Sequence, residues 1–264
     1  MKIIAIKGGL GNQLFQYAYG RNLEISGKEI AFDISFFEGN KAVKDTARNF
    51  KLTNFNIETK AEFSTKRHLF SKIKSKIKRR LGFTQEGLYQ NEKYFINREE
   101  TIRKEFTLKN PLAPKSLVWK EKINSTTNSI ALHIRRGDYI LNTKINNFHG
   151  VCDLAYYKSA LDEMFKRLGN NINVFVFSDD IIWAKENLKF PRPLDFVSDL
   201  EIPDYEEMYL MSLCKNNIIA NSTFSWWSAW LNQNPEKIVI APKQWFTNKT
   251  SNEIDILPKD WLQI

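Results

Sequence analysis

The segment His133 to Tyr139 (HIRRGDY) combines residue types that suit the binding of a phosphate group. Arg135 and Arg136 follow the apolar run Ser129 to Leu132, which predicts a buried parallel strand. A guanidinium group is planar and can bind two phosphate oxygens at once, and open α/β sheets bind ligands at the carboxyl ends of their strands. The simpler alternative is an exposed arginine pair in an ion pair with Asp138. The position at a strand end favours an anion site.

A second predicted strand, Asn173 to Phe177, also ends in polar residues, here Ser178, Asp179 and Asp180. The two carboxylates could cap the following helix or accept hydrogen bonds from a base or a ribose. They could also hold a metal ion, but the sequence offers no other acidic cluster at matching spacing. We therefore predict no metal site.

A third predicted strand, Ile218 to Ala220, leads into Asn221, Ser222 and Thr223 at the start of a helix. Free backbone N–H groups and the helix dipole favour a phosphate at such a position. A simple helix N-cap is the alternative, and it is the commoner role of such a pair. Three tryptophans share one face of this helix and are predicted to lie in the core, namely Trp226, Trp227 and Trp230.

The sequence around His133 and around the two cysteines indicates neither a catalytic nor a metal-binding role for them. A lone histidine on a strand is usually a structural hydrogen-bonding group. Cys152 and Cys214 lie in apolar contexts without metal-ligand spacing and are predicted to be buried free thiols, which fits a reducing compartment. The sequence has neither a Cys/His set for zinc nor the Gly-x-Ser-x-Gly motif of hydrolases.

The N-terminus predicts a strand at Lys2 to Ile6, a glycine loop at Gly8 to Gln13 and a helix that ends at Gly27. This order of elements brings backbone N–H groups up to an anionic ligand. The dinucleotide-binding fingerprint is broken because position 14 is Leu, and no Gly-Lys-Ser/Thr of a P-loop follows. A nicotinamide-dependent enzyme is therefore disfavoured.

Strands and helices alternate through the second half of the chain, which predicts an α/β fold with a parallel sheet. The predicted helices include one from Asp153 to Gly169 and one that begins with a capping box of Asp204 and Glu207. Prolines at 111 and 114 mark a boundary, so we predict two domains, residues 1–112 and 113–264. Residues 40–65 show no clear pattern.

The 264 residues carry a net charge of +9 and are 42% hydrophobic, which supports a folded protein and argues against disorder. Residues 66–81 predict a basic helix with one narrow apolar stripe, which could lie on an anionic membrane or dock on the protein. A nucleic-acid-binding segment would interleave aromatic residues with the basic ones, and Phe70 is the only Phe, Tyr or Trp in this run, so nucleic-acid binding is disfavoured. No run is long enough to cross a membrane and no leader peptide is evident, so we expect a cytoplasmic protein, with peripheral contact at the inner face of the plasma membrane as the alternative.

Four motifs occur in a fixed order and together resemble those of the bacterial α-1,2-fucosyltransferases of glycosyltransferase family 11. They are Gly9 to Gln13 (GLGNQ), His133 to Tyr139, Phe177 to Asp180 (FSDD) and Asn221 to Trp227 (NSTFSWW). Two further segments, Glu207 to Ser212 and Ala241 to Phe246, also resemble sequences of that family. The resemblance spans nearly the whole chain and is weakest over residues 40–110.

The resemblance implies a GT-B architecture, in which two Rossmann-like domains face each other across a cleft. Residues 1–112 would form the acceptor side, and residues 113–264 would bind the donor, GDP-β-L-fucose. The implied reaction places L-fucose on the 2-OH of a terminal galactose of an oligosaccharide, with inversion and without a required metal or other cofactor. A GDP-sugar transferase with another acceptor, including a protein, is the nearest alternative.

The resemblance also implies roles for individual residues. Arg135 would hold the diphosphate with Asp138 nearby, Asp179 or Asp180 would recognise guanosine, and Asn12 would reach the reacting groups from the other domain. The predicted catalytic residues are Arg135, Asn12 and Asp138. The predicted donor-binding residues are Gly11, His133, Arg135, Arg136, Ser178, Asp179, Asp180, Asn221, Ser222, Thr223 and Phe224.

Overall fold

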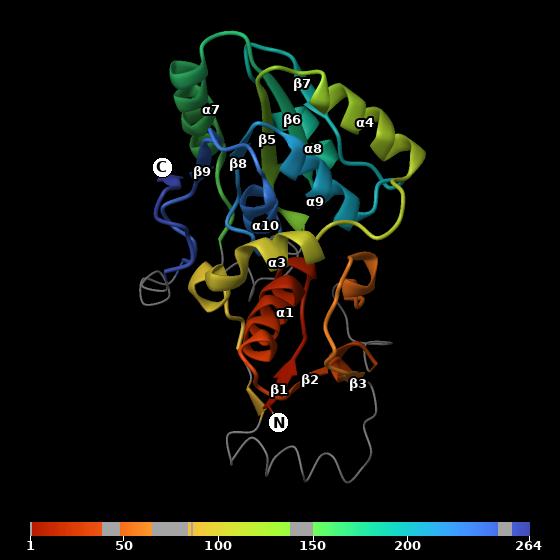
Figure 1. The fold of residues 1–264 in the computed structure, drawn as a ribbon. Coiled ribbons are helices and arrows are strands. Elements are labelled where there is room, and N and C mark those ends of the chain that lie inside the picture. The colour runs from red at the N-terminus through yellow and green to blue at the C-terminus, as the bar shows by residue number, and fades with distance from the viewer. Residues whose placement is uncertain (1, 39–47, 65–83, 86, 138–149, 248–254) are drawn as a thin grey trace. The chain divides into compact units, whose positions relative to one another are not determined.

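The protein is described by a computed structural model, shown in Figure 1. It describes residues 2–38, 48–64, 84–85, 87–137, 150–247 and 255–264. The chain divides into two compact units, Met1–Asn110 and Pro111–Ile264. The predicted basic helix at residues 66–81 and the predicted catalytic residue Asp138 lie outside the described residues.

The N-terminal unit contains a parallel sheet with the strand order β3-β2-β1-β4. Its strands are β1 (Lys2–Ala5), β2 (Ile30–Asp33), β3 (Phe63–Ser64) and β4 (Thr84–Gln85). Its α-helices are α1 (Leu10–Ile25) and α3 (Glu99–Glu105), and its short 3₁₀ turns are Ser35–Phe37, Leu52–Asn54, Glu92–Tyr94 and Ile96–Arg98. The predicted first strand, glycine loop and helix are confirmed.

Helix α1 lies close against the sheet because of one glycine and one aromatic stack. A Cβ at Gly20 would lie 2.4 Å from Cε1 of Phe32, so only glycine allows the helix to approach β2 this closely. The ring of Tyr17 stacks on Phe32 at 5.4 Å, and Phe32 stacks on Phe63 at 4.9 Å. These contacts hold α1 against β2.

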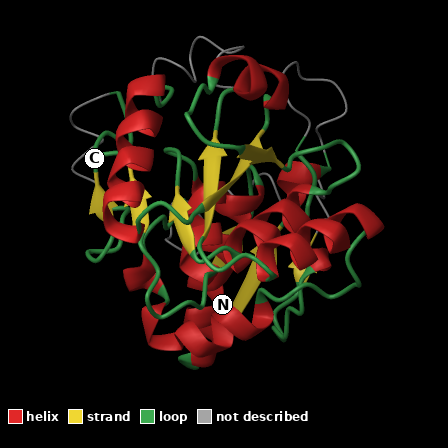
Figure 2. Cartoon of the chain, turned by 90° about the horizontal axis from the view of Figure 1, so that it is seen from above, coloured by secondary structure: helices red, strands yellow, loops and turns green. Residues whose placement is uncertain are grey.

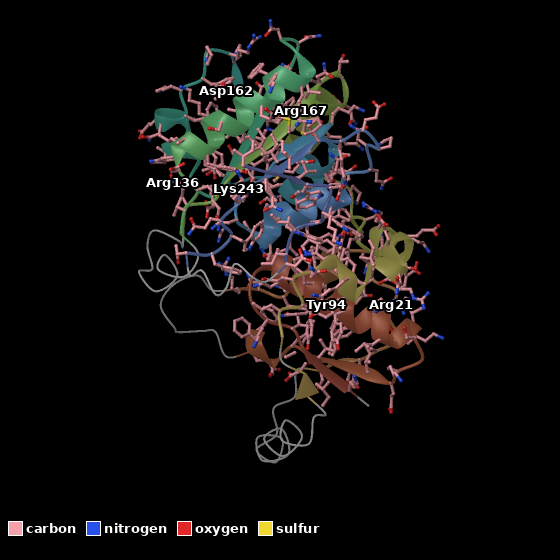
Figure 3. The ribbon with its side chains drawn as sticks, turned by 90° about the vertical axis from the view of Figure 1, so that its left-hand side faces the viewer. Arg21, Tyr94, Arg136, Asp162, Arg167 and Lys243 are labelled. Carbon is pink, nitrogen blue, oxygen red and sulfur yellow. The ribbon has the colours of Figure 1, made fainter. Side chains whose placement is uncertain are left out.

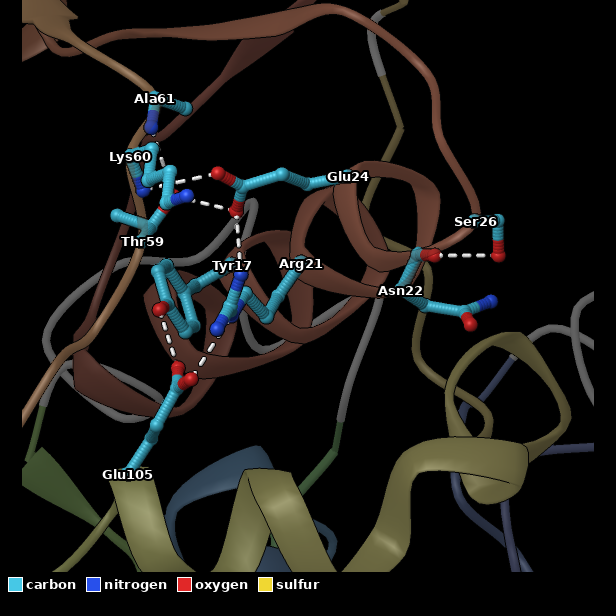
Figure 4. A network of polar contacts seen from close by, with 9 residues as sticks. All are labelled: Tyr17, Arg21, Asn22, Glu24, Ser26, Thr59, Lys60, Ala61 and Glu105. Atoms are coloured by element: carbon cyan, nitrogen blue, oxygen red, sulfur yellow. Dashed lines mark hydrogen bonds and ion pairs between the residues drawn. The ribbon is translucent and has the colours of Figure 1, made fainter.

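A buried polar network joins α1 to α3 (Figure 4). Glu105 is fully buried, and it accepts hydrogen bonds from the hydroxyl of Tyr17 and from Nε of Arg21, the latter at 2.8 Å. Arg21 also pairs with Glu24 at 2.8 Å, and Glu24 in turn accepts from the hydroxyl of Thr59 at 2.7 Å. A buried carboxylate is costly unless it is paired and hydrogen-bonded, and here both conditions hold.

The C-terminal unit contains a six-stranded parallel sheet with the order β10-β9-β8-β5-β6-β7. Its strands are β5 (Ser129–Ile134), β6 (Asn173–Ser178), β7 (Leu194–Phe196), β8 (Asn216–Ile218), β9 (Val239–Ala241) and β10 (Leu262–Gln263). Counted along the unit, this is the 3-2-1-4-5-6 order of doubly wound nucleotide-binding sheets. The order reverses between β5 and β8, so the switch point lies at their carboxyl ends.

Helices cover both faces of this sheet (Figure 2). They are α4 (Pro114–Asn124), α7 (Leu154–Leu168), α8 (Ile181–Asn187), α9 (Asp204–Leu213) and α10 (Thr223–Leu231). Alternate residues of β5 face opposite sides: Ile130, Leu132 and Ile134 pack with α7 and α8, whereas Ala131 packs with α4 and α9. Both faces are apolar, which explains why β5 is buried throughout.

Most predicted helix ends in this unit are confirmed, and one is wrong. Asp153 caps α7 by accepting from the Tyr156 N–H at 2.8 Å, and Gly169 ends that helix with φ +75°. The predicted capping box of Asp204 and Glu207 does not form. Pro203 occupies the N-cap position, and its carbonyl accepts from the N–H groups of Glu206 and Glu207.

Candidate nucleotide-sugar site

The ends of β5 and β6 bring the predicted arginines and aspartates together. The two strands pair in register up to Ile134 opposite Ser178, so the next residues of each strand are neighbours. Arg135 Nη1 lies 3.0 Å from Asp179 Oδ2, and the Arg136 N–H donates to Asp179 Oδ1 at 2.8 Å. Among the described residues, Asp179 therefore pairs with Arg135, and sequence spacing did not identify this partner.

Gly137 is required by this arrangement. A Cβ at position 137 would lie 2.6 Å from Asp179 Oδ2, closer than any ordinary contact. The glycine thus lets the chain pass directly over the carboxylate that orients the guanidinium of Arg135.

Arg136 is held mainly by stacking. Its guanidinium carbon lies 3.4 Å from the ring centroid of Trp183, whereas its Nε is 3.8 Å from Asp180 Oδ2. At these distances the cation–π contact is the closer of the two interactions. Figure 3 labels Arg136 near one end of α7, with Arg167 near the other end of that helix. Sequence patterns indicated no role for Trp183. Its position in the first turn of the helix that Asp180 caps is the only sequence feature that could have placed it near Arg136.

Asp180 and Ser178 have structural partners. Asp180 caps α8 by accepting from the Trp183 N–H at 3.1 Å, and its own N–H donates to the Ser178 hydroxyl at 3.0 Å. The capping alternative is confirmed for Asp180. A role of Asp179 or Asp180 toward guanosine stays a prediction.

Across the switch point, His133 of β5 lies beside Phe224 at the start of α10, with 5.5 Å between ring centroids. His133 is buried, and burial together with the charge of Arg135 lowers its pKa to about 3. It is therefore a neutral imidazole near neutral pH. Its Nδ1 has no hydrogen-bond partner within the described part of the chain, so the expected structural hydrogen bond is not seen there.

The start of α10 is organised by Asn221 and Ser222. Ser222 is the N-cap, with its hydroxyl accepting from the Phe224 N–H at 3.3 Å, and Thr223 begins the helix. The buried Asn221 side chain donates to the carbonyls of Gly150 and Trp245, both at 3.2 Å. Asn221 therefore positions the surrounding loops. The tryptophans Trp226, Trp227 and Trp230 are buried, as predicted.

Glu207 is a further carboxyl group near Asp179 that sequence reasoning placed in a helix cap. It hydrogen-bonds the Ser198 hydroxyl, which accepts from the N–H of Ser178 at 2.9 Å. Burial, opposed in part by that hydrogen bond and reinforced by the charges of Asp204 and Asp179, raises the pKa of Glu207 to about 8. It is therefore largely protonated at neutral pH.

The remaining predicted residues, Gly11 and Asn12, lie in the first turn of α1 in the N-terminal unit. The described residues include no group of three His, Cys, Asp or Glu side chains able to hold a metal ion. Cys152 and Cys214 are both free thiols, Cys214 buried and Cys152 partly exposed, and burial raises the pKa of Cys152 to about 11. Over the same described residues, no helix is long and apolar enough to span a membrane.

A doubly wound parallel sheet with two arginines and a helix N-terminus at its switch point is the arrangement of a nucleotide-binding α/β protein. The sequence model described as Glycosyl transferase family 11 matches residues 35–264. The chain belongs to glycosyl transferase family 11, and it is a glycosyltransferase.

Two bacterial relatives align over nearly their full length. An α-1,2-colitosyltransferase of Escherichia coli is 35% identical over 99% of this chain and 98% of its own. The O-antigen biosynthesis glycosyltransferase WbnK of Escherichia coli is 31% identical over 98% of this chain and 99% of its own. The human galactoside α-(1,2)-fucosyltransferase 1 is 30% identical over 52% of this chain and 40% of its own.

Among solved structures, NodZ α-1,6-fucosyltransferase soaked with GDP-fucose matches with a TM-score of 0.49 and 14% identity, over 87% of this chain and 91% of that one. At that similarity the match adds nothing to the assignment. The α/β class and the parallel sheets are confirmed by the strand pairing itself. The cleft between two facing domains stays a prediction.

Proposed function

We propose that the protein transfers L-fucose from GDP-β-L-fucose to the 2-OH of a terminal galactose and forms an α-linkage. The observation that carries the proposal is the ion-paired Arg135 at the switch point of a nucleotide-binding sheet, in a chain whose relatives include α-1,2-glycosyltransferases. A galactose-terminated oligosaccharide used in surface glycan synthesis is the proposed acceptor.

The chemistry requires a site that stabilises negative charge on the leaving diphosphate. In the proposed step, the acceptor oxygen bonds to the anomeric carbon as the bond from that carbon to the diphosphate oxygen breaks. The electron pair of the broken bond leaves with GDP, and the acceptor proton passes to solvent or to the departing phosphate. Arg135 binds the diphosphate in this proposal, and its charge is worth most in the transition state, where the leaving group gains charge.

Asp179 supports that role by fixing the guanidinium. It pairs with Arg135 Nη1 at 3.0 Å and is itself held by the Arg136 N–H at 2.8 Å, so the guanidinium has a fixed partner before a ligand arrives. Preorganised groups stabilise charge without a cost of reorganisation during the reaction.

A second donor, GDP-colitose, is favoured by the 35% identity to an α-1,2-colitosyltransferase. Colitose is L-fucose without its 3-hydroxyl group, so the two candidates differ at one polar group. A pocket that hydrogen-bonds the 3-OH rejects the deoxy sugar by about 10⁴-fold, whereas an apolar pocket discriminates against the added hydroxyl by only about 10²-fold.

The test measures kcat/KM for GDP-L-fucose and GDP-colitose with lactose as acceptor and determines the product linkage by NMR. We expect transfer to galactose O2 with the α configuration. A β-linked product, or substitution at another position, would contradict the proposal. A large preference for GDP-colitose would replace the donor and leave the site assignment in place.

A further inference from the structure

The segment Gly87 to Tyr94 lies along one face of α1 and is held there at four points. The helix residues that hold it recur every three or four positions, as residues on one side of a helix do. The contacts are Gln16 Nε2 to the Gly87 carbonyl at 3.5 Å, the ring of Tyr19 on Tyr89 at 3.9 Å, Gln90 Nε2 to Asn12 Oδ1 at 2.8 Å, and Asn22 Nδ2 to the Tyr94 carbonyl at 2.8 Å. Figure 3 labels Tyr94, at the end of this segment, in the N-terminal unit.

Tyr89 adopts an unusual backbone conformation within this segment. Its φ of +51° is the left-handed region that non-glycine residues rarely occupy, and such a residue persists only when its surroundings hold it. The Tyr89 ring is stacked on Tyr19 and meets Tyr94 edge-on at 5.6 Å. A Cβ at Gly87 would lie 2.8 Å from that ring, so glycine is needed beneath it. The strained turn brings the next residue, Gln90, to Asn12.

The contact with Gln90 fixes which way the Asn12 carboxamide points. Its oxygen accepts from Gln90, and its nitrogen lies above Gly8, 2.9 Å from the place of a Cβ that Gly8 lacks. Asn12 is half-buried, and over the described residues its Nδ2 makes no hydrogen bond.

The other two amides of the same helix turns use both their oxygen and their nitrogen within the protein. Gln13 accepts from the Lys51 N–H and donates to the carbonyls of Gly8 and Asn49. Gln16 accepts from the Lys7 N–H and donates to the carbonyl of Gly87. Of the three, Asn12 is the amide whose nitrogen makes no hydrogen bond to the described residues.

We propose that Gln90 is a positioning residue of the transfer reaction. Its N–H holds Asn12 Oδ1, so that Asn12 Nδ2 donates to a hydroxyl oxygen of the acceptor saccharide. This inference rests on the proposed function, which assigns Asn12 to the reacting groups. A misplacement of about 1 Å in such a group costs about 10²-fold in rate, so the orientation of this amide has a measurable effect.

The test compares Gln90→Met, Gln90→Glu and Asn12→Ala in steady-state transfer from GDP-fucose to lactose. Methionine keeps the size of the side chain and removes the donor. A glutamate carboxylate can only accept a hydrogen bond, so the Asn12 carboxamide would rotate to present its nitrogen to it. We expect a fall of 10- to 100-fold in kcat/KM for the acceptor in both Gln90 variants. The dissociation constant for GDP should stay within twofold of the wild type.

Asn22→Ala is the matched control, because it removes another anchor of the same segment without touching Asn12. It should leave transfer within twofold of the wild type, and all variants should keep the wild-type circular dichroism spectrum. In the Asn12→Ala background, Gln90→Met should have no further effect, because the two residues act as one unit.

Wild-type kinetics in Gln90→Met, an equal loss in Asn22→Ala, or additive losses in the double variant would each overturn the positioning role. If the wild-type enzyme transfers neither L-fucose nor colitose to lactose, the proposed function fails and this inference falls with it. An active wild type with unaffected Gln90 variants refutes the inference alone.

Discussion

Replacement of Gly137 by alanine tests whether Asp179 organises the arginine site. The added Cβ would lie 2.6 Å from Asp179 Oδ2 and 3.1 Å from its Cγ, whereas ordinary contact begins at 3.4 Å. The carboxylate must move away, and its contacts with Arg135 at 3.0 Å and with the Arg136 N–H at 2.8 Å must lengthen.

The cost follows from those two contacts. A hydrogen bond to a charged group contributes about 1.5–3 kcal/mol, and partial exposure of the pair to solvent reduces this. We therefore expect a loss of about 1–3 kcal/mol in transition-state stabilisation. This corresponds to a fall in kcat/KM of about 5- to 150-fold, since about 1.4 kcal/mol is a factor of ten.

The assay is kcat/KM for the donor together with calorimetric titration of GDP, in a double-mutant cycle with Asp179→Ala. Once the carboxylate is removed, alanine at position 137 has nothing to displace, so its effect should vanish in the Asp179→Ala background. Additive losses, or wild-type activity in Gly137→Ala, would refute the role of Asp179 as the group that orients Arg135.

Four further outcomes are expected. Arg135→Lys keeps the charge but loses the planar fork, so turnover should fall by about two orders of magnitude, and near-normal turnover would reject the assigned role. Activity should survive EDTA, and a loss restored by magnesium or manganese would contradict the predicted metal independence. Glu207 has a folded pKa of about 8, above its ordinary 4.5, so its stabilising effect is present below pH 4.5 and is lost as pH rises through 8. The unfolding free energy of Glu207→Gln, relative to that of the wild type, should therefore rise between about pH 6 and 8, by up to about 1.4 kcal/mol per pH unit, and melting curves at each pH measure it. The exposed Glu236→Gln control should show no such trend. Residues 66–81 are expected to favour sedimentation with anionic over neutral vesicles, at about 1 kcal/mol per basic residue near the surface, and equal pelleting would remove that prediction.

Local patterns in the sequence were sufficient for the strands and helices that are long or strongly apolar. Ser129 to Leu132 is buried on both faces, and its apolar run predicted a central parallel strand. The prolines near residue 111 lie at the division between the two compact units. Over residues 40–110, strands such as Phe63–Ser64 have only two residues, too few to show a period.

The sequence also determined that Arg135 and Arg136 follow a strand, because that order is a property of the chain itself. Their partners depended on the tertiary structure. Asp179 meets Arg135 only because β5 and β6 pair in register, and the raised pKa of Glu207 arises from burial and from charges brought in by the fold.

The difference between local spacing and tertiary contact explains both the wrong prediction at α9 and the hydrogen bond between Gln90 and Asn12, which the sequence did not reveal. Asp204 and Glu207 have the spacing of a capping box, but Pro203 already provides the extended N-cap conformation. The helix therefore begins at Asp204, one residue earlier than it would if Asp204 were the N-cap. Gln90 and Asn12 are 78 positions apart, and their hydrogen bond depends on the left-handed turn at Tyr89. Residue spacing specifies neighbours within one strand or one helix turn, whereas contacts between distant segments arise only when the chain has packed.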